Sequence, residues 1–184
     1  MKRYPGPPEI HWLEIANPYF VFEYYFFINI PEDYKHETQI EEFASATYEH
    51  ETLCNADVID AHFSQVTDRF IPGQRYGVKI FMLRRRMTPE ECFFFLKGQR
   101  DTQFVGAQGL AFTIRNYRHL LPLGLILLSL DEREHLFEDC DHDRMIPGAM
   151  RTRDGKIDFG LCKFDTTLTS EYGLICFCGP VPRL

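Results

Sequence analysis

The most regular pattern of apolar positions lies near the N-terminus, between residues 19 and 30. Aromatic and β-branched side chains fill almost every position from Tyr19 to Ile30, on both faces of an alternation with a period of two. This pattern predicts a β-strand that is apolar on both sides. We expect such a strand to lie centrally in a sheet covered on both faces, or to have one face sealed by a partner or a ligand. Residues 12–16 alternate in the same way and predict a shorter strand.

The clearest helix signal lies at residues 88–98. Thr88 is suited to the N-cap, Pro89 to the first helical position and Gly98 to the C-cap, and Glu91 completes a capping box. The body of the segment, from Cys92 to Leu96, is apolar on all sides. The sequence therefore predicts a deeply buried helix at residues 89–97.

The rest of the chain mixes helical and strand patterns. A capping-box pattern at Thr38–Glu41 predicts a helix that extends to Tyr48, and residues 55–70 favour a helix although part of this segment also alternates. After a turn at 71–74, a short acidic helix is predicted at 131–138. The predicted strands are 76–83, 103–118 with interruptions at Gly106 and Gly109, 123–130, 156–164 and 172–178. The last two strands are expected to form a hairpin or to lie side by side.

These elements together predict an α+β fold. Strands outnumber helices after residue 74 and no repeat is visible, so we expect a mostly antiparallel or mixed sheet with a few helices packed on it. The chain of 184 residues is expected to form a single domain, 1–184, with a boundary between two layers near 71–75. A chain of this length buries enough apolar surface to fold without disulfides or a structural metal.

Charge and composition restrict the cellular compartments and the kinds of partner that we expect. Lys and Arg total 20 against 27 for Asp and Glu, which gives a net charge of −7 and disfavours bulk binding to nucleic acid or to anionic membranes. No apolar run reaches the ~20 residues of a membrane-spanning helix, and the first residues lack the apolar core of a secretory signal. We therefore expect a cytoplasmic protein whose six cysteines stay reduced.

The strongest polar cluster lies between residues 131 and 143. Asp139, Asp141 and Asp143 alternate as the first ligands of an EF-hand loop do, and His142 could join them. The sixth position of such a loop is Arg144 instead of glycine, and the twelfth is methionine instead of glutamate. We therefore favour a solvated acidic segment, with a divalent-metal site as the alternative.

Arginines and cysteines form two further groups. Arg84, Arg85 and Arg86 make a basic triplet, which Arg118 and its neighbours would enlarge if the two segment ends meet. A phosphate or an acidic surface could dock there. Ion pairing with nearby glutamates is the simpler interpretation. Cys176 and Cys178 share one face of a predicted strand, where core packing is favoured over a zinc site completed by Cys162.

The sequence matches no catalytic motif, whereas its 17 Phe and 9 Tyr supply many aromatic groups suited to contact. We predict a non-catalytic protein-binding module, such as an inhibitor, immunity-type or adaptor protein, with no cofactor and a partner whose surface is basic. The predicted contact residues are Arg84, Arg85, Arg86, Arg118 and Tyr25. The alternatives are a homodimer through the outer face of the strand at 19–30, and a metal-dependent hydrolase or nuclease that uses Asp139, Asp141, Asp143 and His142.

Overall fold

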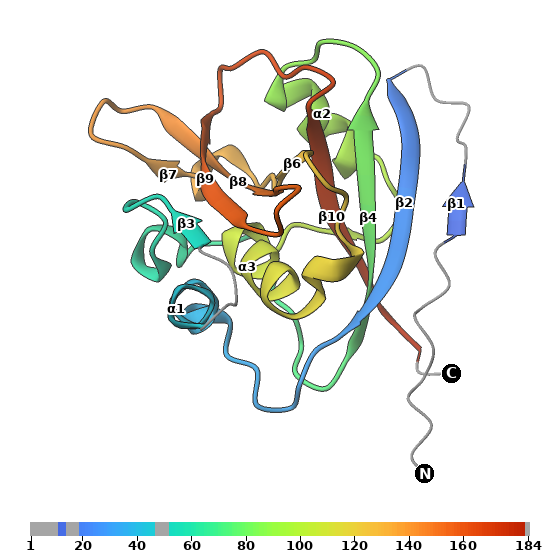
Figure 1. The fold of residues 1–184 in the computed structure, drawn as a ribbon, viewed down its shortest axis with the longest axis vertical. Helices are drawn as coiled ribbons and strands as arrows, with labels where there is room; N and C mark the ends of the chain where they lie inside the picture. Colours follow the sequence, from blue (N-terminus) through green and yellow to red (C-terminus); the bar gives the residue numbers. More distant parts are fainter. Residues whose placement is uncertain (1–10, 14–18, 47–51, 183–184) are drawn as a thin grey trace.

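The computed structural model describes residues 11–13, 19–46 and 52–182, and it confirms the α+β class. One mixed, mostly antiparallel sheet bends around a central helix (Figure 1). Its strands lie in the order β1 (His11–Leu13), β2 (Phe20–Asn29), β4 (Arg75–Leu83), β10 (Tyr172–Val181), β6 (Ile126–Leu128), β8 (Arg144–Arg151), β9 (Ile157–Lys163) and β3 (Thr52–Cys54). Two short strands lie outside this order: β5 (Thr102–Gln103) pairs with β10, and β7 (Phe137–Glu138) pairs with β8.

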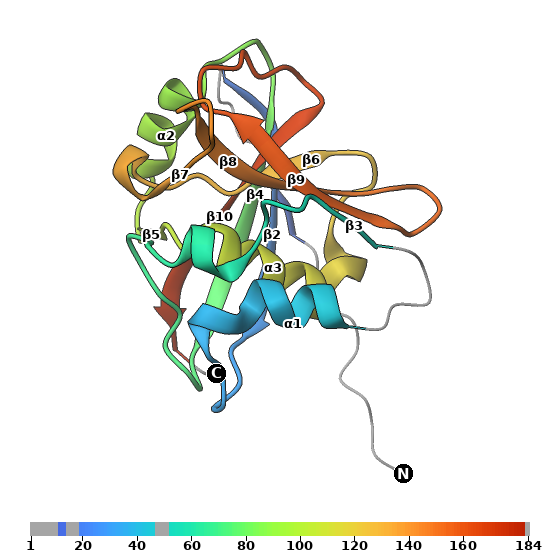
Figure 2. The same ribbon diagram turned by 90° about the vertical axis from the view of Figure 1, so that its left-hand side faces the viewer.

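Helices cover both faces of the sheet (Figure 2). On one face lie α1 (Gln39–Ser45) and α3 (Gly106–Tyr117), and on the other lies α2 (Pro89–Lys97). Short 3-10 turns occupy His36–Thr38, Asp60–Phe63, Arg118–Leu120 and Arg133–His135. Two apolar cores result, one between the sheet and α1 and α3, and a second between the sheet and α2.

Strand β2 is the element that the sequence predicted best. It lies between β1 and β4, so it is central in its part of the sheet. Tyr24, Phe26 and Ile28 point into the first core, and Phe20 points into the second. Of the shorter strand predicted at 12–16, residues 14–16 lie outside the described residues.

Helix α2 has the predicted ends but not the predicted burial. The Thr88 hydroxyl accepts from the backbone of Glu91 at 3.2 Å, and the Glu91 carboxylate accepts from the backbone of Thr88 at 2.8 Å, which completes the capping box. Only Pro89, Cys92 and Leu96 are buried, and Phe94 is 63% exposed. The expectation of all-round burial was wrong because the helix packs against one layer only and its outer face meets solvent.

Helix α3 replaces the strands predicted at 103–118, and this prediction was wrong. Ala107, Leu110, Ala111 and Ile114 are buried at helical spacing and face the first core. A Cβ at Gly109 would lie 2.8 Å from the side chain of Val105 and 3.0 Å from that of Phe177. Glycine at position 109 therefore allows the helix to pack directly on β10. The sequence analysis had interpreted this glycine as an interruption of a strand.

Several other predictions were also wrong. Residues 55–70 contain a single 3-10 turn, although Val58, Phe63 and Phe70 are buried. The segment at 131–138 forms a 3-10 turn and the short β7 instead of an acidic helix. Strands β9 and β10 are not neighbours, because β6 and β8 lie between them. Strand β8 went unpredicted because Pro147 and Gly148 interrupt its apolar pattern.

Helix α1 begins as predicted but is capped differently. No capping hydrogen bond comes from the Thr38 side chain. Instead, the Asp60 carboxylate accepts from the backbone N–H groups of Ile40 at 3.0 Å and of Glu41 at 2.9 Å. The helix ends at Ser45, and the predicted end at Tyr48 lies outside the described residues.

Among the described residues, no helix combines the length and the apolar character that crossing a membrane requires.

Candidate partner-binding surface

The three aspartates of the acidic segment come together in the turn between β7 and β8. Carboxylate oxygens of Asp139, Asp141 and Asp143 all lie within 4.8 Å of one another. The Asp139 carboxylate accepts from the backbone N–H groups of Asp141 and Asp143, each at 2.9 Å, and Asp143 is paired with the Lys163 ammonium. These contacts close a hairpin turn and engage two of the three carboxylates, those of Asp139 and Asp143.

His142 does not join these aspartates. Its backbone has a positive φ of 65°, and its Nδ1 lies 2.8 Å from the Glu138 carboxylate. Glu138 also pairs with Arg144 at 2.8 Å. Pairing with the imidazole and the guanidinium holds the pKa of the Glu138 carboxyl below its usual range.

The arginine triplet and Arg118 lie at opposite ends of the sheet. Arg84 follows the end of β4 that pairs with Phe20, and its N–H donates to the Tyr19 carbonyl at 2.8 Å. Arg118 follows Tyr117, whose hydroxyl accepts from the N–H of Asn29 at the other end of β2. Because a strand of ten residues spans roughly 30 Å, the two groups do not form one patch.

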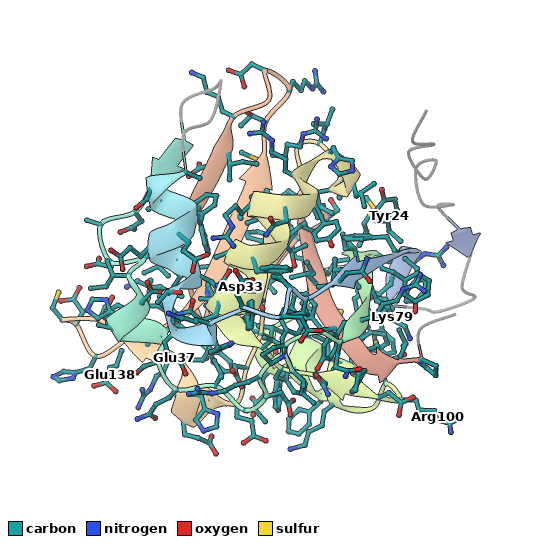
Figure 3. The ribbon with its side chains drawn as sticks, turned by 90° about the horizontal axis from the view of Figure 1, so that it is seen from below. Tyr24, Asp33, Glu37, Lys79, Arg100 and Glu138 are labelled. Atoms are coloured by element: carbon teal, nitrogen blue, oxygen red, sulfur yellow. The ribbon has the colours of Figure 1, made fainter. Side chains whose placement is uncertain are left out.

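Tyr25 lies away from both groups of arginines. It pairs with Lys79 of β4, and its ring contacts Phe27 edge to face at a centroid distance of 4.9 Å. The Arg75 guanidinium lies 3.8 Å from the centroid of the Phe27 ring. Lys79 and Glu138 lie on opposite sides of the molecule (Figure 3), so the acidic turn and the Tyr25 region are separate surfaces.

The cysteines do not converge. Cys176 and Cys178 are on β10, whereas Cys162 is on β9, three strand positions away, a separation of about 14 Å. Cys92 and Cys162 are free thiols. Burial raises the pKa of the Cys92 thiol to about 12 and raises that of Cys162 as well, which opposes nucleophilic chemistry.

The outer face of α2 carries Phe94, the most exposed aromatic side chain among the described residues. Phe95 anchors it, because its ring packs on Phe20 at a centroid distance of 4.0 Å and on Phe81 at 5.1 Å. Phe93 packs on Phe104 at 4.9 Å. Phe94, between them, projects into solvent. We call Phe93, Phe94, Phe95, Tyr19 and Phe164 the α2 surface.

Phe94 separates two hollows. The first, of about 400 Å³, lies between α2 and the side chains of Tyr19, Arg85 and Met87. The Arg85 guanidinium covers the Tyr19 ring at 4.5 Å. The second, of about 280 Å³, lies between α2 and residues 131–134, with Phe164 in its wall. A ridge with a cavity on each side offers an anchor and two receiving sites to a partner.

The rim of the second hollow carries unbalanced negative charge. Lys97 is paired with Glu132 at 3.4 Å, and the Arg133 guanidinium lies 5.5 Å from the centre of the Phe164 ring. Glu90 and Glu134 are exposed on the same rim and form no ion pair with any described residue. The rim therefore attracts a cationic side chain.

A polar network around the buried Asp131 carboxylate lies beneath the second hollow. The Thr67 hydroxyl lies 2.9 Å from His135 Nδ1 and also donates to the Asp131 carboxylate, which accepts the N–H of Glu132 at 2.7 Å. Burial raises the pKa of Asp131 to about 6, although the bonds from Thr67 and Glu132 oppose this. The network ties the loop at 64–68 to the wall of the hollow. Sequence reasoning missed it because Thr67 and Asp131 are 64 residues apart.

Comparison of the chain with protein-family models, with curated proteins and with solved structures finds no match.

Proposed function

We propose that the protein is a protein-binding module, and that the α2 surface receives a partner segment in which an apolar side chain lies next to lysine or arginine. The observation that carries the proposal is the 63% exposure of Phe94 between two hollows. Aromatic side chains at the centre of an interface, beside cavities, supply most of its binding energy. An inhibitor, immunity-type or adaptor role would use such a surface.

Charge complementarity supports a basic partner. Glu90 and Glu134 flank the apolar ridge, and the net charge of −7 extends the attraction beyond the contact region. We further propose a cytoplasmic setting, which the free thiols of Cys92, Cys140 and Cys162 support because reducing compartments preserve them.

Selection from a displayed peptide library tests the proposal. Wild-type protein should enrich peptides that combine a large apolar residue with adjacent Lys or Arg, and Phe94→Ser should weaken their binding by about 30-fold or more. Leu123→Ser is the matched control, because Leu123 is 54% exposed and lies outside both hollows. Selected peptides that bind Phe94→Ser as tightly as wild type would refute the proposal.

The metal-dependent hydrolase or nuclease remains a second proposal because Asp139, Asp141 and Asp143 converge. Lys163 and the backbone N–H groups of the turn already engage two of these carboxylates. Calorimetric titration with Mg²⁺, Mn²⁺ and Ca²⁺ distinguishes the two functions. A binding module gives no saturation below about 1 mM, whereas tighter binding that Asp141→Ala abolishes would favour the hydrolase.

A further inference from the structure

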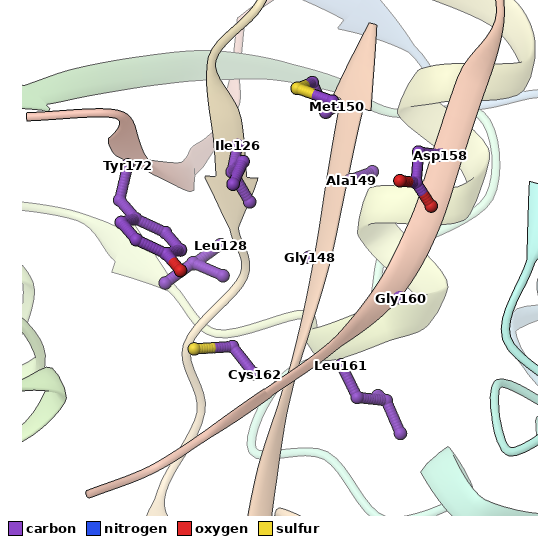
Figure 4. A pocket seen from close by; sticks show the side chains of 10 residues that line it. All are labelled: Ile126, Leu128, Gly148, Ala149, Met150, Asp158, Gly160, Leu161, Cys162 and Tyr172. Atoms are coloured by element: carbon purple, nitrogen blue, oxygen red, sulfur yellow. The ribbon is translucent and has the colours of Figure 1, made fainter. Parts of the chain in front are cut away.

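A second recessed site lies on the sheet itself, on the face that α2 only partly covers. A groove of about 180 Å³ runs across β6, β8 and β9 (Figure 4). Tyr172 and Ile126 line one bank, and Asp158 lies at the other. Strand register places these three side chains on one face with Met150 between them. The groove is separate from the α2 surface, because no residue lines both.

Two glycines make the floor of the groove. Gly148 and Gly160 are directly opposite each other on β8 and β9. A Cβ at Gly148 would come within 2.7 Å of the Leu128 side chain, so packing explains this glycine. A Cβ at Gly160 would have no neighbour within 4 Å, and Gly160 has no positive φ. Neither space nor backbone conformation requires glycine there.

Glycine in a strand interior weakens the strand and often marks the place where a ligand approaches the backbone closely. The open position at Gly160 lies in a groove that is lined by apolar side chains and by the Tyr172 ring. Tyr172 and Cys162 both line the groove, and the Tyr172 ring forms one of its walls. A flat apolar ring therefore fits over Gly160, beside the Leu128 side chain that occupies the space above Gly148, and any side chain at position 160 would displace this ring.

The single charge in the groove defines the other end of the ligand. Asp158 is exposed, lines the groove, and forms no ion pair or hydrogen bond with any described residue. It lies two residues from Gly160 on the same strand face, a separation of about 6.6 Å. This separation matches an aromatic ring joined to an ammonium group by a linker of two carbons.

We propose that the groove is a binding site for small aromatic amines, with the ring stacked on Gly160 and the ammonium group paired with Asp158. A ligand of this size in an open groove binds with a Kd on the order of 1 mM. The site is independent of the α2 surface, so partner binding and amine binding can be tested separately.

The test is titration of the ¹⁵N-labelled protein with 2-phenylethylamine, followed by the backbone amide signals of Gly148 and Gly160. We expect saturable shifts at both glycines, and affinity at least about fivefold weaker for the neutral analogue 2-phenylethanol. Asp158→Asn should remove this preference, whereas the exposed control Asp33→Asn should keep it. Absence of shifts at the glycines, or equal affinity for the two compounds, overturns the proposal.

Gly160→Val tests the floor independently of charge. The added side chain enters open space on a strand, so the midpoint of thermal unfolding should stay the same or rise. Binding of 2-phenylethylamine should nevertheless be lost. Retained binding overturns the proposal, and so does a fall in the unfolding midpoint, because that result would make Gly160 a packing requirement.

Discussion

The Thr67 hydroxyl donates a hydrogen bond of 2.5 Å to the carboxylate of Asp131, a residue that is 3% exposed. This contact joins two loops that are 64 residues apart in the sequence and supports the wall of the second hollow, between α2 and residues 131–134. Because the carboxylate is buried, ionising it costs free energy in the folded state, and the pKa of Asp131 rises from 3.8 to about 6.

The raised pKa predicts how stability depends on pH. A carboxyl whose pKa is higher in the folded state favours folding most below its unfolded pKa, and this contribution is lost as the pH rises through the folded pKa. The free energy of unfolding of wild type, relative to Asp131→Asn, should therefore fall by on the order of 3 kcal/mol between about pH 4 and pH 7. Urea unfolding of both proteins across this range measures it, and a constant difference would contradict the prediction.

His36 predicts the opposite dependence. Burial, and next the positive charge of Arg69, lower the pKa of His36 from 6.5 to about 4, and the side chain is 5% exposed. The stability that neutral His36 allows is present above about pH 6.5 and is lost as the pH falls toward 4, by on the order of 3 kcal/mol. The same urea series on His36→Gln should lack this loss, whereas a parallel decline in both proteins would exclude His36 as its origin.

Asp60 should stabilise α1 more than Thr38, the capping residue that the sequence predicted. Asp60 accepts two backbone N–H groups at the start of the helix, and the Thr38 side chain accepts none. Asp60→Ala should cost about 1–2 kcal/mol of unfolding free energy, with a smaller change for Thr38→Ala. Chemical denaturation of the two variants measures the costs, and a reversed order would show that the local capping pattern governs the helix after all.

Gly109 should tolerate no side chain. The added Cβ would press on Val105 and Phe177, so Gly109→Ala should destabilise the fold by about 1–3 kcal/mol despite the better helix propensity of alanine. Gly160→Ala, in open space, is the matched control. Thermal unfolding distinguishes the two, and a stabilised Gly109→Ala would contradict the close packing of α3 on β10.

These contrasts show what the sequence could predict. The alternation of Tyr19 to Ile30 and the capping box at Thr88 are local and strong, and both elements formed where expected. Helix α3 was missed because its small residues are needed for close contact with β10, which lies about 70 residues further along the chain. A glycine that allows close helix packing cannot be distinguished, from the sequence alone, from a glycine that interrupts a strand. Gly106 and Gly109 fit both interpretations.

The same reasoning explains the outcome for the candidate site. Neighbouring aspartates at 139, 141 and 143 converged because a single turn contains them. Arg118 and the arginine triplet are far apart because they lie near opposite ends of β2. The local sequence pattern does not show which end of a strand a distant segment will reach. The hollows beside Phe94 could not be predicted, because each is formed by segments that meet only in the folded chain, and because an apolar helix was expected to be buried.

The footprint of a bound peptide on the protein tests the central claim most directly. A peptide selected on the wild-type protein should, on titration, shift the backbone amide signals of α2 around Phe94 and those of Arg133 and Glu134, and leave the turn at 139–143 unchanged. A footprint centred on that turn, or on Tyr25 and Lys79, would contradict the assignment of partner binding to the α2 surface.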